Sequence, residues 1–153
     1  MSNNNRHVVV PACYVFLIRG GKILLLLRAN TGYHDGDYGV PAGHVEADEL
    51  PVSAVVRETK EEAGVTLDRE KIKMVHTQYR HCGDHERVDF FFVAESWDGE
   101  PTNVEPDKCD ELRWTPLAQL PVNMVPHEAA ALAEYQKGNS YSEWHEAALK
   151  VGS

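Results

Sequence analysis

Three glutamates near the middle of the chain have a spacing that suits metal binding. Glu58 lies three residues before Glu61 and four before Glu62, so on a helix all three carboxylates occupy one face. Carboxylates this close repel one another in water, whereas a divalent cation such as Mg²⁺ takes oxygen ligands and neutralises their charge. A solvated acidic face is the alternative explanation, and the flanking residues favour the metal site.

A helix from Pro51 to Ala63 is expected to position these acids. Pro51 suits the first turn of a helix, and Gly64 suits the left-handed residue that ends one. Side chains that recur at helical spacing form an apolar stripe opposite the acids: Val52, Val55, Val56, Thr59 and Ala63. Upstream, Gly43 in a Pro-Ala-Gly loop allows a tight turn that exposes a carbonyl oxygen. The segment therefore predicts a carboxylate face beside an exposed backbone oxygen.

The same segment resembles the Nudix box of the Nudix hydrolases. The residues that carry the resemblance are Gly43, five residues, Glu49, seven residues, and then Arg57-Glu58-Thr59-Lys60-Glu61-Glu62-Ala63-Gly64-Val65. Two positions depart from the family pattern, because Thr59 replaces an aliphatic residue and Ala42 stands where many members carry glycine. The resemblance implies that Glu58, Glu61, Glu62 and the Gly43 carbonyl hold Mg²⁺, for which Mn²⁺ can substitute. It also implies that one of these glutamates acts as general base.

Arg57 is expected to serve catalysis indirectly. It sits beside Glu58 and can pair with Glu49, which would orient the carboxylates rather than contact substrate.

Two further residues are candidates by the same resemblance. Glu105 lies in the connection at 97–110, where MutT-type members often supply an additional metal-binding or basic glutamate; Asp110 and Glu111 compete for this role. Arg28 follows a predicted strand, where many members place an arginine against substrate phosphate. Exposed surface positions are the alternative for both Glu105 and Arg28.

His127 and Glu128 begin the last predicted helix, in the stretch that contacts the nucleobase in MutT-like members. We therefore expect them to select the base, the alternative for Glu128 being an ordinary helix acid favoured by the dipole. His34, Asp35 and Tyr38 lie in a polar loop that could line the pocket or only face water. Zinc binding by His81, Cys82 and His85 is disfavoured because a second ligand pair is missing.

The rest of the chain predicts one α/β unit without repeats. Strands are expected at 8–18 and 22–27, joined by the hairpin signal Gly20-Gly21, and again at 73–79, 87–95 and 112–115. Residues 31–39 are expected to form a loop, and 126–137 a closing helix. Strands with helices on both sides fit the α/β/α sandwich with a mixed β-sheet that the resemblance implies.

Length and composition predict a single domain over residues 1–153. Residues 1–7 are expected to be a flexible N-terminus, and 139–153 a weakly structured tail that Tyr141, Trp144 and Leu149 could dock. Three scattered cysteines, with no signal-like N-terminus and no apolar run long enough to cross a bilayer, favour a cytoplasmic protein without membrane contact. A homodimer is left open.

The net charge of −9 disfavours binding to duplex nucleic acid and favours a small nucleotide substrate, without excluding an RNA 5′ end. By resemblance, the expected activity is Mg²⁺-dependent hydrolysis of a nucleoside diphosphate linked to a group X. The proline that marks ADP-ribose hydrolases is absent from the window at Arg80 to Cys82. The tyrosine of dinucleoside polyphosphate hydrolases is not at its usual offset, although Tyr79 comes near, and no SQPWPFP element follows.

By elimination, a MutT-like hydrolase of nucleoside triphosphates or modified dNTPs, releasing monophosphate and pyrophosphate, is the expectation. Hydrolysis of a nucleotide sugar, a dinucleoside polyphosphate or capped RNA is the alternative. A non-catalytic nucleotide sensor is disfavoured because all three glutamates are present. An isopentenyl diphosphate isomerase, which needs a cysteine and a glutamate, is disfavoured because Cys13, Cys82 and Cys109 lack recognisable flanking motifs.

Overall fold

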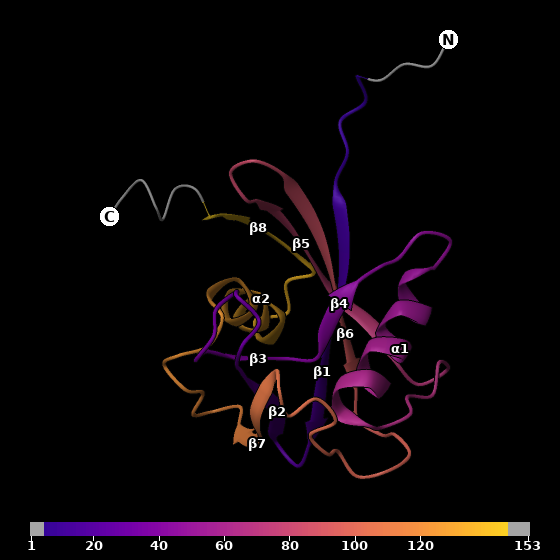
Figure 1. Ribbon diagram of the computed structural model, residues 1–153, viewed down its shortest axis with the longest axis vertical. Helices are drawn as coiled ribbons and strands as arrows, with labels where there is room; N and C mark the ends of the chain where they lie inside the picture. The colour runs from indigo at the N-terminus through magenta and orange to yellow at the C-terminus, as the bar shows by residue number, and fades with distance from the viewer. Residues whose placement is uncertain (1–4, 147–153) are drawn as a thin grey trace.

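A computed structural model describes residues 5–146 as a mixed β-sheet with one helix on each side (Figure 1). This is the α/β/α architecture predicted from the sequence. Neither helix in the described range has the length and hydropathy needed to cross a bilayer. The elements, in chain order, are β1 Val10–Arg19, β2 Lys22–Arg28, β3 Tyr38–Gly39, β4 Ala42–His44, α1 Pro51–Ala63, β5 Lys73–His81, β6 Glu86–Ala94, β7 Cys109–Pro116, α2 Pro126–Gln136 and β8 Tyr141–His145.

Strand β1 is the centre of the sheet. It pairs antiparallel with β2 and β4 and parallel with β6, within the strand order β3-β2-β1-β6-β5-β8. Strand β7 pairs with β2. The pairing of β4 with β1 sets Gly43 opposite Cys13, and so fixes the backbone that precedes α1.

Side chains alternate along β1 between two hydrophobic cores, as the pleat of a strand requires. Cys13, Val15 and Leu17 belong to the core under α1, together with Ala54, Val55 and Ala63 of that helix. The intervening residues belong to the core under α2, together with its Ala131 and Leu132: Ala12, Tyr14 and Phe16. Because both faces of the sheet are covered, β1 and β2 are apolar almost throughout.

The helix and hairpin signals in the sequence are confirmed. Helix α1 runs from Pro51 to Ala63, and Gly64 ends it at a left-handed φ of 74°. Gly20 and Gly21 join β1 to β2 with φ values of 59° and 74°. Glycine adopts such positive φ values readily because it has no Cβ atom.

Three short strands contradict the predictions for their segments. Strands β3 and β4 lie where a loop was expected, because two or three residues are too few to show an alternating pattern. Strand β8 lies in the predicted weakly structured tail, and it pairs parallel with β5 at the edge of the sheet. Tyr141 and Trp144 are part of it, whereas Leu149 and residues 1–4 lie outside the described range.

Candidate active site

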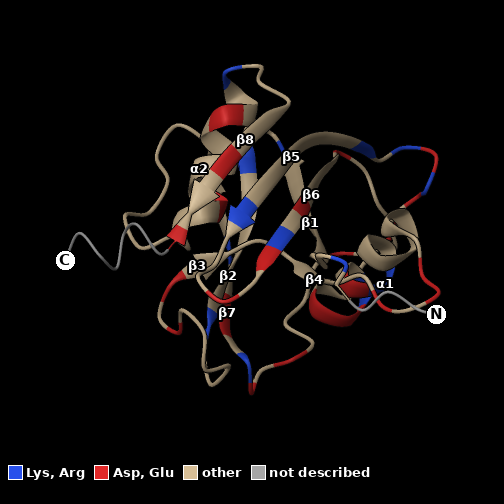
Figure 2. Ribbon diagram, turned by 90° about the horizontal axis from the view of Figure 1, so that it is seen from above, with Lys and Arg blue, Asp and Glu red and all other residues tan. Residues whose placement is uncertain are grey.

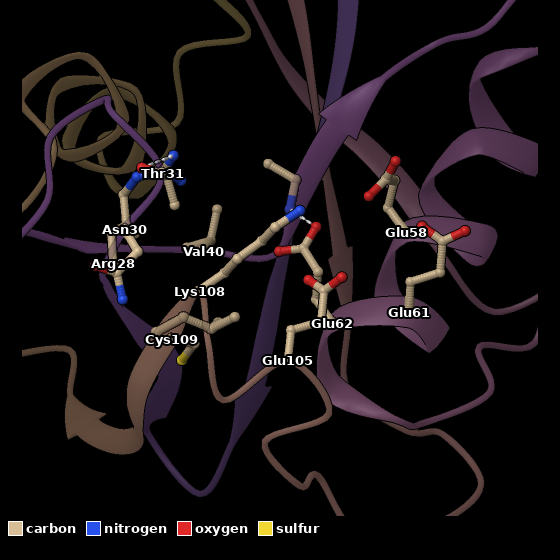
Figure 3. Close-up of a pocket in the computed structure, with 13 residues that line it drawn as sticks. Arg28, Asn30, Thr31, Val40, Glu58, Glu61, Glu62, Glu105, Lys108 and Cys109 are labelled. Atoms are coloured by element: carbon tan, nitrogen blue, oxygen red, sulfur yellow. Dashed lines mark hydrogen bonds between the residues drawn. The ribbon is translucent and has the colours of Figure 1, made fainter.

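The structure gathers most of the predicted site residues around one cavity of about 460 Å³. Glu58, Glu61 and Glu62 line it from α1, and Glu105 and Lys108 line it from the turn before β7 (Figure 3). Arg28, from the end of β2, lies on the opposite side from the glutamates. The cavity therefore has an acidic wall facing a basic one.

Gly43 is the point where strand β4 meets the acidic face of α1. A Cβ atom added at Gly43 would lie 2.0 Å from the Cδ atom of Glu58, so only glycine leaves room for this carboxylate against the backbone. The neighbouring backbone N–H of Ala42 donates to Oε2 of Glu62 at 3.4 Å. Strand β4 thus brings main-chain groups directly beside two of the three carboxylates.

Arg57 makes the contacts that were expected of it. Its Nε and Nη2 atoms donate to the two oxygens of Glu49 at 2.8 and 2.9 Å, and Nη1 donates to Glu58 at 2.7 Å. Hydrogen bonding to Arg57 lowers the pKa of Glu49 to about 2. Because Arg57 lines neither of the cavities described here, its geometry fits a role in orienting Glu58.

The acidic wall has the chemistry of a divalent cation site. Carboxylate and carbonyl oxygens are the donors that Mg²⁺ prefers. Burial, and then hydrogen bonding to Glu58, raises the pKa of Glu62 well above its usual range. No three Asp, Glu, His or Cys side chains within residues 5–146 already converge on one point, and Arg57 occupies one oxygen of Glu58. The donors fit the ion, and their role as ligands stays a prediction.

A second cavity, of about 550 Å³, adjoins the first and shares Arg28 and Ala42 with it. His127 and Glu128 line it from the first turn of α2. The Nε2 atom of His127 lies 3.2 Å from the hydroxyl of Tyr14, and Oε1 of Glu128 accepts a hydrogen bond from Val40 N at 2.8 Å. The two predicted base-selecting residues are therefore adjacent to the acidic wall but not part of it.

Glu128 lies in the first turn of α2, where the helix dipole favours an acid, but its side chain is buried. It is only 3% exposed, and this burial raises its pKa to about 7. Burial also lowers the pKa of His127 well below its usual value. Both groups can therefore meet a ligand in their neutral forms.

Sequence reasoning missed a buried ion pair under the second cavity. Arg80 on β5 and Asp89 on β6 are 3% and 0% exposed, and Nε of Arg80 lies 2.5 Å from Oδ2 of Asp89. Glu146, just after β8, lies 2.9 Å from Nη1 of Arg80. The sequence did contain a signal for this pair. In β5 and β6 every second residue tends to be buried, and Arg80 and Asp89 are charged residues at such positions.

Among the three acids considered for an additional metal-binding or basic role, Glu105 lines the first cavity. Glu111 instead accepts a hydrogen bond from the Tyr38 hydroxyl, and Asp110 does not line the site. Asp35 accepts hydrogen bonds from the backbone of Thr31 and Gly32, and so holds its own loop.

The residues considered for zinc do not assemble. The His81 ring stacks on His145, with centroids 4.5 Å apart, and His85 contacts Asp84. These three histidines and Cys82 form no cluster of ligands in the described part of the chain.

Comparisons with known proteins agree with this geometry. The NUDIX domain family profile matches residues 6–135. The chain is 29% identical over 116 residues to the "Putative 8-oxo-dGTP diphosphatase 3" of Mycobacterium tuberculosis (strain CDC 1551 / Oshkosh), covering 75% of this chain and 52% of that protein. It is 33% identical over 122 residues to the "Isopentenyl-diphosphate Delta-isomerase" of Jannaschia sp. (strain CCS1), covering 71% and 65% respectively. A crystal structure of a MutT NUDIX hydrolase from Burkholderia pseudomallei matches with a TM-score of 0.76 and 29% identity, over 83% of this chain and 98% of that one.

The chain belongs to the Nudix hydrolase family, which confirms the resemblance seen in the sequence. Within this family it is a MutT-like pyrophosphohydrolase. The family acts on nucleotide substrates and typically depends on a divalent metal.

Proposed function

We propose that this enzyme hydrolyses nucleoside triphosphates, including oxidised dNTPs, to the monophosphate and pyrophosphate with Mg²⁺. One observation carries the proposal: the acidic wall faces Arg28 across the first cavity, and Arg28 also lines the adjoining second cavity, which contains His127 and Glu128. A diphosphate has space between the two walls, and a nucleoside has space beside them. The name of the mycobacterial relative, a putative 8-oxo-dGTP diphosphatase, supports the same substrate class.

Each wall of the cavity has a distinct task in this proposal. Glu58, Glu61, Glu62 and the Gly43 carbonyl would hold Mg²⁺, which when bound neutralises phosphate oxygens and lowers the pKa of water. Arg28 is already oriented for phosphate, since Nε donates to Tyr33 O at 2.8 Å and Nη2 to Thr31 Oγ1 at 3.2 Å. These two contacts leave the positive charge of Arg28 available for phosphate, because a carbonyl and a hydroxyl oxygen are both neutral acceptors.

Proton transfer is assigned to the glutamates of the same cavity. A carboxylate takes a proton from the attacking water, the new P–O bond forms, and the bridging P–O bond breaks. Glu105 comes from the turn before β7 rather than from α1, and it lies beside Glu62 in the cavity (Figure 3). It can therefore serve as this base while the three glutamates of α1 remain available as ligands. Burial of Glu128 suits base selection, because a neutral carboxyl both donates and accepts hydrogen bonds.

The test is a hydrolysis screen of about fifty nucleotides with Mg²⁺ and with EDTA. It includes oxidised triphosphates, nucleotide sugars, ADP-ribose, dinucleoside polyphosphates and capped RNA. Metal-dependent release of monophosphate and pyrophosphate from triphosphates, at higher kcat/KM than from the other compounds, is the expected result. Preference for another conjugate would overturn the substrate assignment, and no turnover of any nucleotide would overturn the proposed activity.

Isopentenyl diphosphate belongs in the same screen. A relative is named as an isomerase of this compound, and Cys109 lines the first cavity beside Glu105. The Cys109 thiol donates to Glu111 O at 3.2 Å, and burial raises its pKa. A thiol held in this way is a poor proton-transfer group, so we expect no isomer.

A further inference from the structure

The second cavity contains an arginine that forms no ion pair within residues 5–146, although the buried carboxylate of Asp89, two residues along β6, offsets part of its charge. Arg87 of β6 lines this cavity together with His44 of β4. Within residues 5–146 its guanidinium forms no ion pair, and its one hydrogen bond joins Nη2 to Nε2 of His44 at 2.9 Å. A guanidinium has five N–H donors, and the buried Nε of Arg87 has no acceptor. Most of the N–H donors of Arg87 therefore have no acceptor among the described residues.

Two other buried or partly buried arginines of this protein do form ion pairs, unlike Arg87. Arg80, in the same cavity, pairs with Asp89 and Glu146. Arg57, beside the first cavity, pairs with Glu49 and Glu58. The described chain also has many more acids than bases to offer, as Figure 2 shows for the acidic stretches around α1. An unpaired Arg87 in such a protein indicates a partner that comes from outside.

His44 holds Arg87 in place without cancelling its charge. An arginine can only donate hydrogen bonds, so Nε2 of His44 must be the acceptor and carries no proton. His44 follows Gly43, whose missing Cβ faces Glu58. Because side chains alternate along a strand, the His44 side chain points to the face of the sheet opposite to the glutamates of α1. Arg87 of β6 contacts His44 on that face.

We propose that Arg87, oriented by His44, binds a phosphate group of the substrate that is not one of the two joined by the scissile bond. The inference rests on the proposed hydrolysis of a nucleotide. A planar guanidinium with free N–H groups suits the oxygens of a phosphate. The 3′-linked phosphate of an oligonucleotide 5′ end is such a group, because it extends from the nucleoside that the second cavity would hold, whereas the terminal phosphate of a triphosphate lies at the far end of the diphosphate.

The test compares Arg87→Gln with wild type on three compounds that share one base. A nucleoside triphosphate carries a terminal phosphate, a dinucleotide with a 5′-diphosphate carries a 3′-linked phosphate, and a nucleotide sugar carries neither. Loss of a charge-assisted hydrogen bond should raise KM roughly 10- to 100-fold for the compound whose extra phosphate is bound. The KM for the nucleotide sugar should change by less than about twofold.

Arg69→Gln is the matched control, because Arg69 donates to Ser53 at the surface and lines neither of these two cavities. Equilibrium binding of the three compounds in EDTA is measured in parallel. If wild type turns over none of them, the proposed hydrolysis fails while the binding ratios still test Arg87. A selective loss for the dinucleotide supports the proposal, whereas a selective loss for the triphosphate overturns it. An equal loss for all three compounds, or no loss beyond that of the control, overturns it.

Discussion

Replacement of Glu61 or Glu62 by glutamine tests the acidic wall most directly. If these side chains bind Mg²⁺ as proposed, each change removes one carboxylate ligand while keeping the volume of the side chain, so kcat should fall by orders of magnitude. The urea midpoint should stay near that of wild type, because neither residue belongs to the two hydrophobic cores. Steady-state hydrolysis and urea denaturation measure the two effects. Glu70→Gln, on the exposed surface, is the control, and near-normal activity in both cavity variants would contradict the assignment.

Glu128 should make stability depend on pH in the direction opposite to an ordinary surface acid. Burial raises its pKa from 4.5 to about 7, so the folded state binds a proton more tightly than the unfolded state. The stabilisation is fully present below pH 4.5 and is lost as the pH rises through 7, amounting to at most about 3 kcal/mol.

Glu128→Gln should remove this dependence, because glutamine keeps an oxygen acceptor for Val40 N and does not titrate. The measurement is the free energy of unfolding of both proteins at pH 5 and pH 7.5. The difference between wild type and variant should favour the variant more at pH 7.5 than at pH 5. A difference that is the same at both pH values would show that Glu128 is not protonated in the folded protein.

Individual residues were predictable from the sequence where a fixed spacing identifies them. The positions of Glu58, Glu61 and Glu62 on one helix face follow from helical geometry alone. The pairing of Arg57 with Glu49 does not, because Glu49 precedes the helix. Arg87 and His44 were not predictable, because their contact joins two strands that are distant in the chain. Nothing in either local sequence indicates that the other will lie 2.9 Å away.

At the level of whole elements, the Arg80–Asp89 pair links β5 to β6 beneath the second cavity. Arg80→Met should lower the free energy of unfolding by roughly 3 kcal/mol or more, since it leaves the buried Asp89 carboxylate without its partner. Adding Asp89→Asn should restore a large part of this loss, because no unpaired charge is then buried. Urea denaturation of the two single variants and the double variant gives the coupling energy. Losses that simply add would show that the two side chains do not stabilise each other.

The long elements were predictable because they contain enough residues to show a period. Strands β1, β2, β5 and β6 and both helices appear within a few residues of their predicted bounds. Strand β8 was not predictable, because its sequence Tyr-Ser-Glu-Trp-His is largely polar. Its pairing depends on β5 and on His76, whose ring nitrogens lie 2.8 Å from Asn139 O and 2.7 Å from Ser142 Oγ.

For the whole molecule, the net charge of −9 predicts that duplex DNA is not bound. Long-range repulsion should prevent association even at low salt, where electrostatic binding is strongest. Fluorescence anisotropy of a labelled duplex of about 20 base pairs, at 50 mM salt with EDTA, measures this. Affinity that falls steeply with added salt would reveal a basic face for which the described structure gives no indication.

The layer arrangement was expected from the family resemblance, with which the pattern of strands and helices agrees. The order of strands in the sheet was not predictable, because the pattern does not specify that β1 takes the central position. That position depends on pairings such as Val10 with Arg87, between segments from opposite halves of the chain.

The central place of β1 determines the sequence of events when the chain folds. The β1–β2 hairpin closes locally through Gly20 and Gly21, but the other edge of β1 stays open until β6 has been synthesised and has found its parallel register. Contacts between such distant segments form slowly, and an apolar strand edge that waits for its partner can pair with another chain. Refolding yield should therefore fall as protein concentration rises, even though the middle of β1 is buried in the finished sheet.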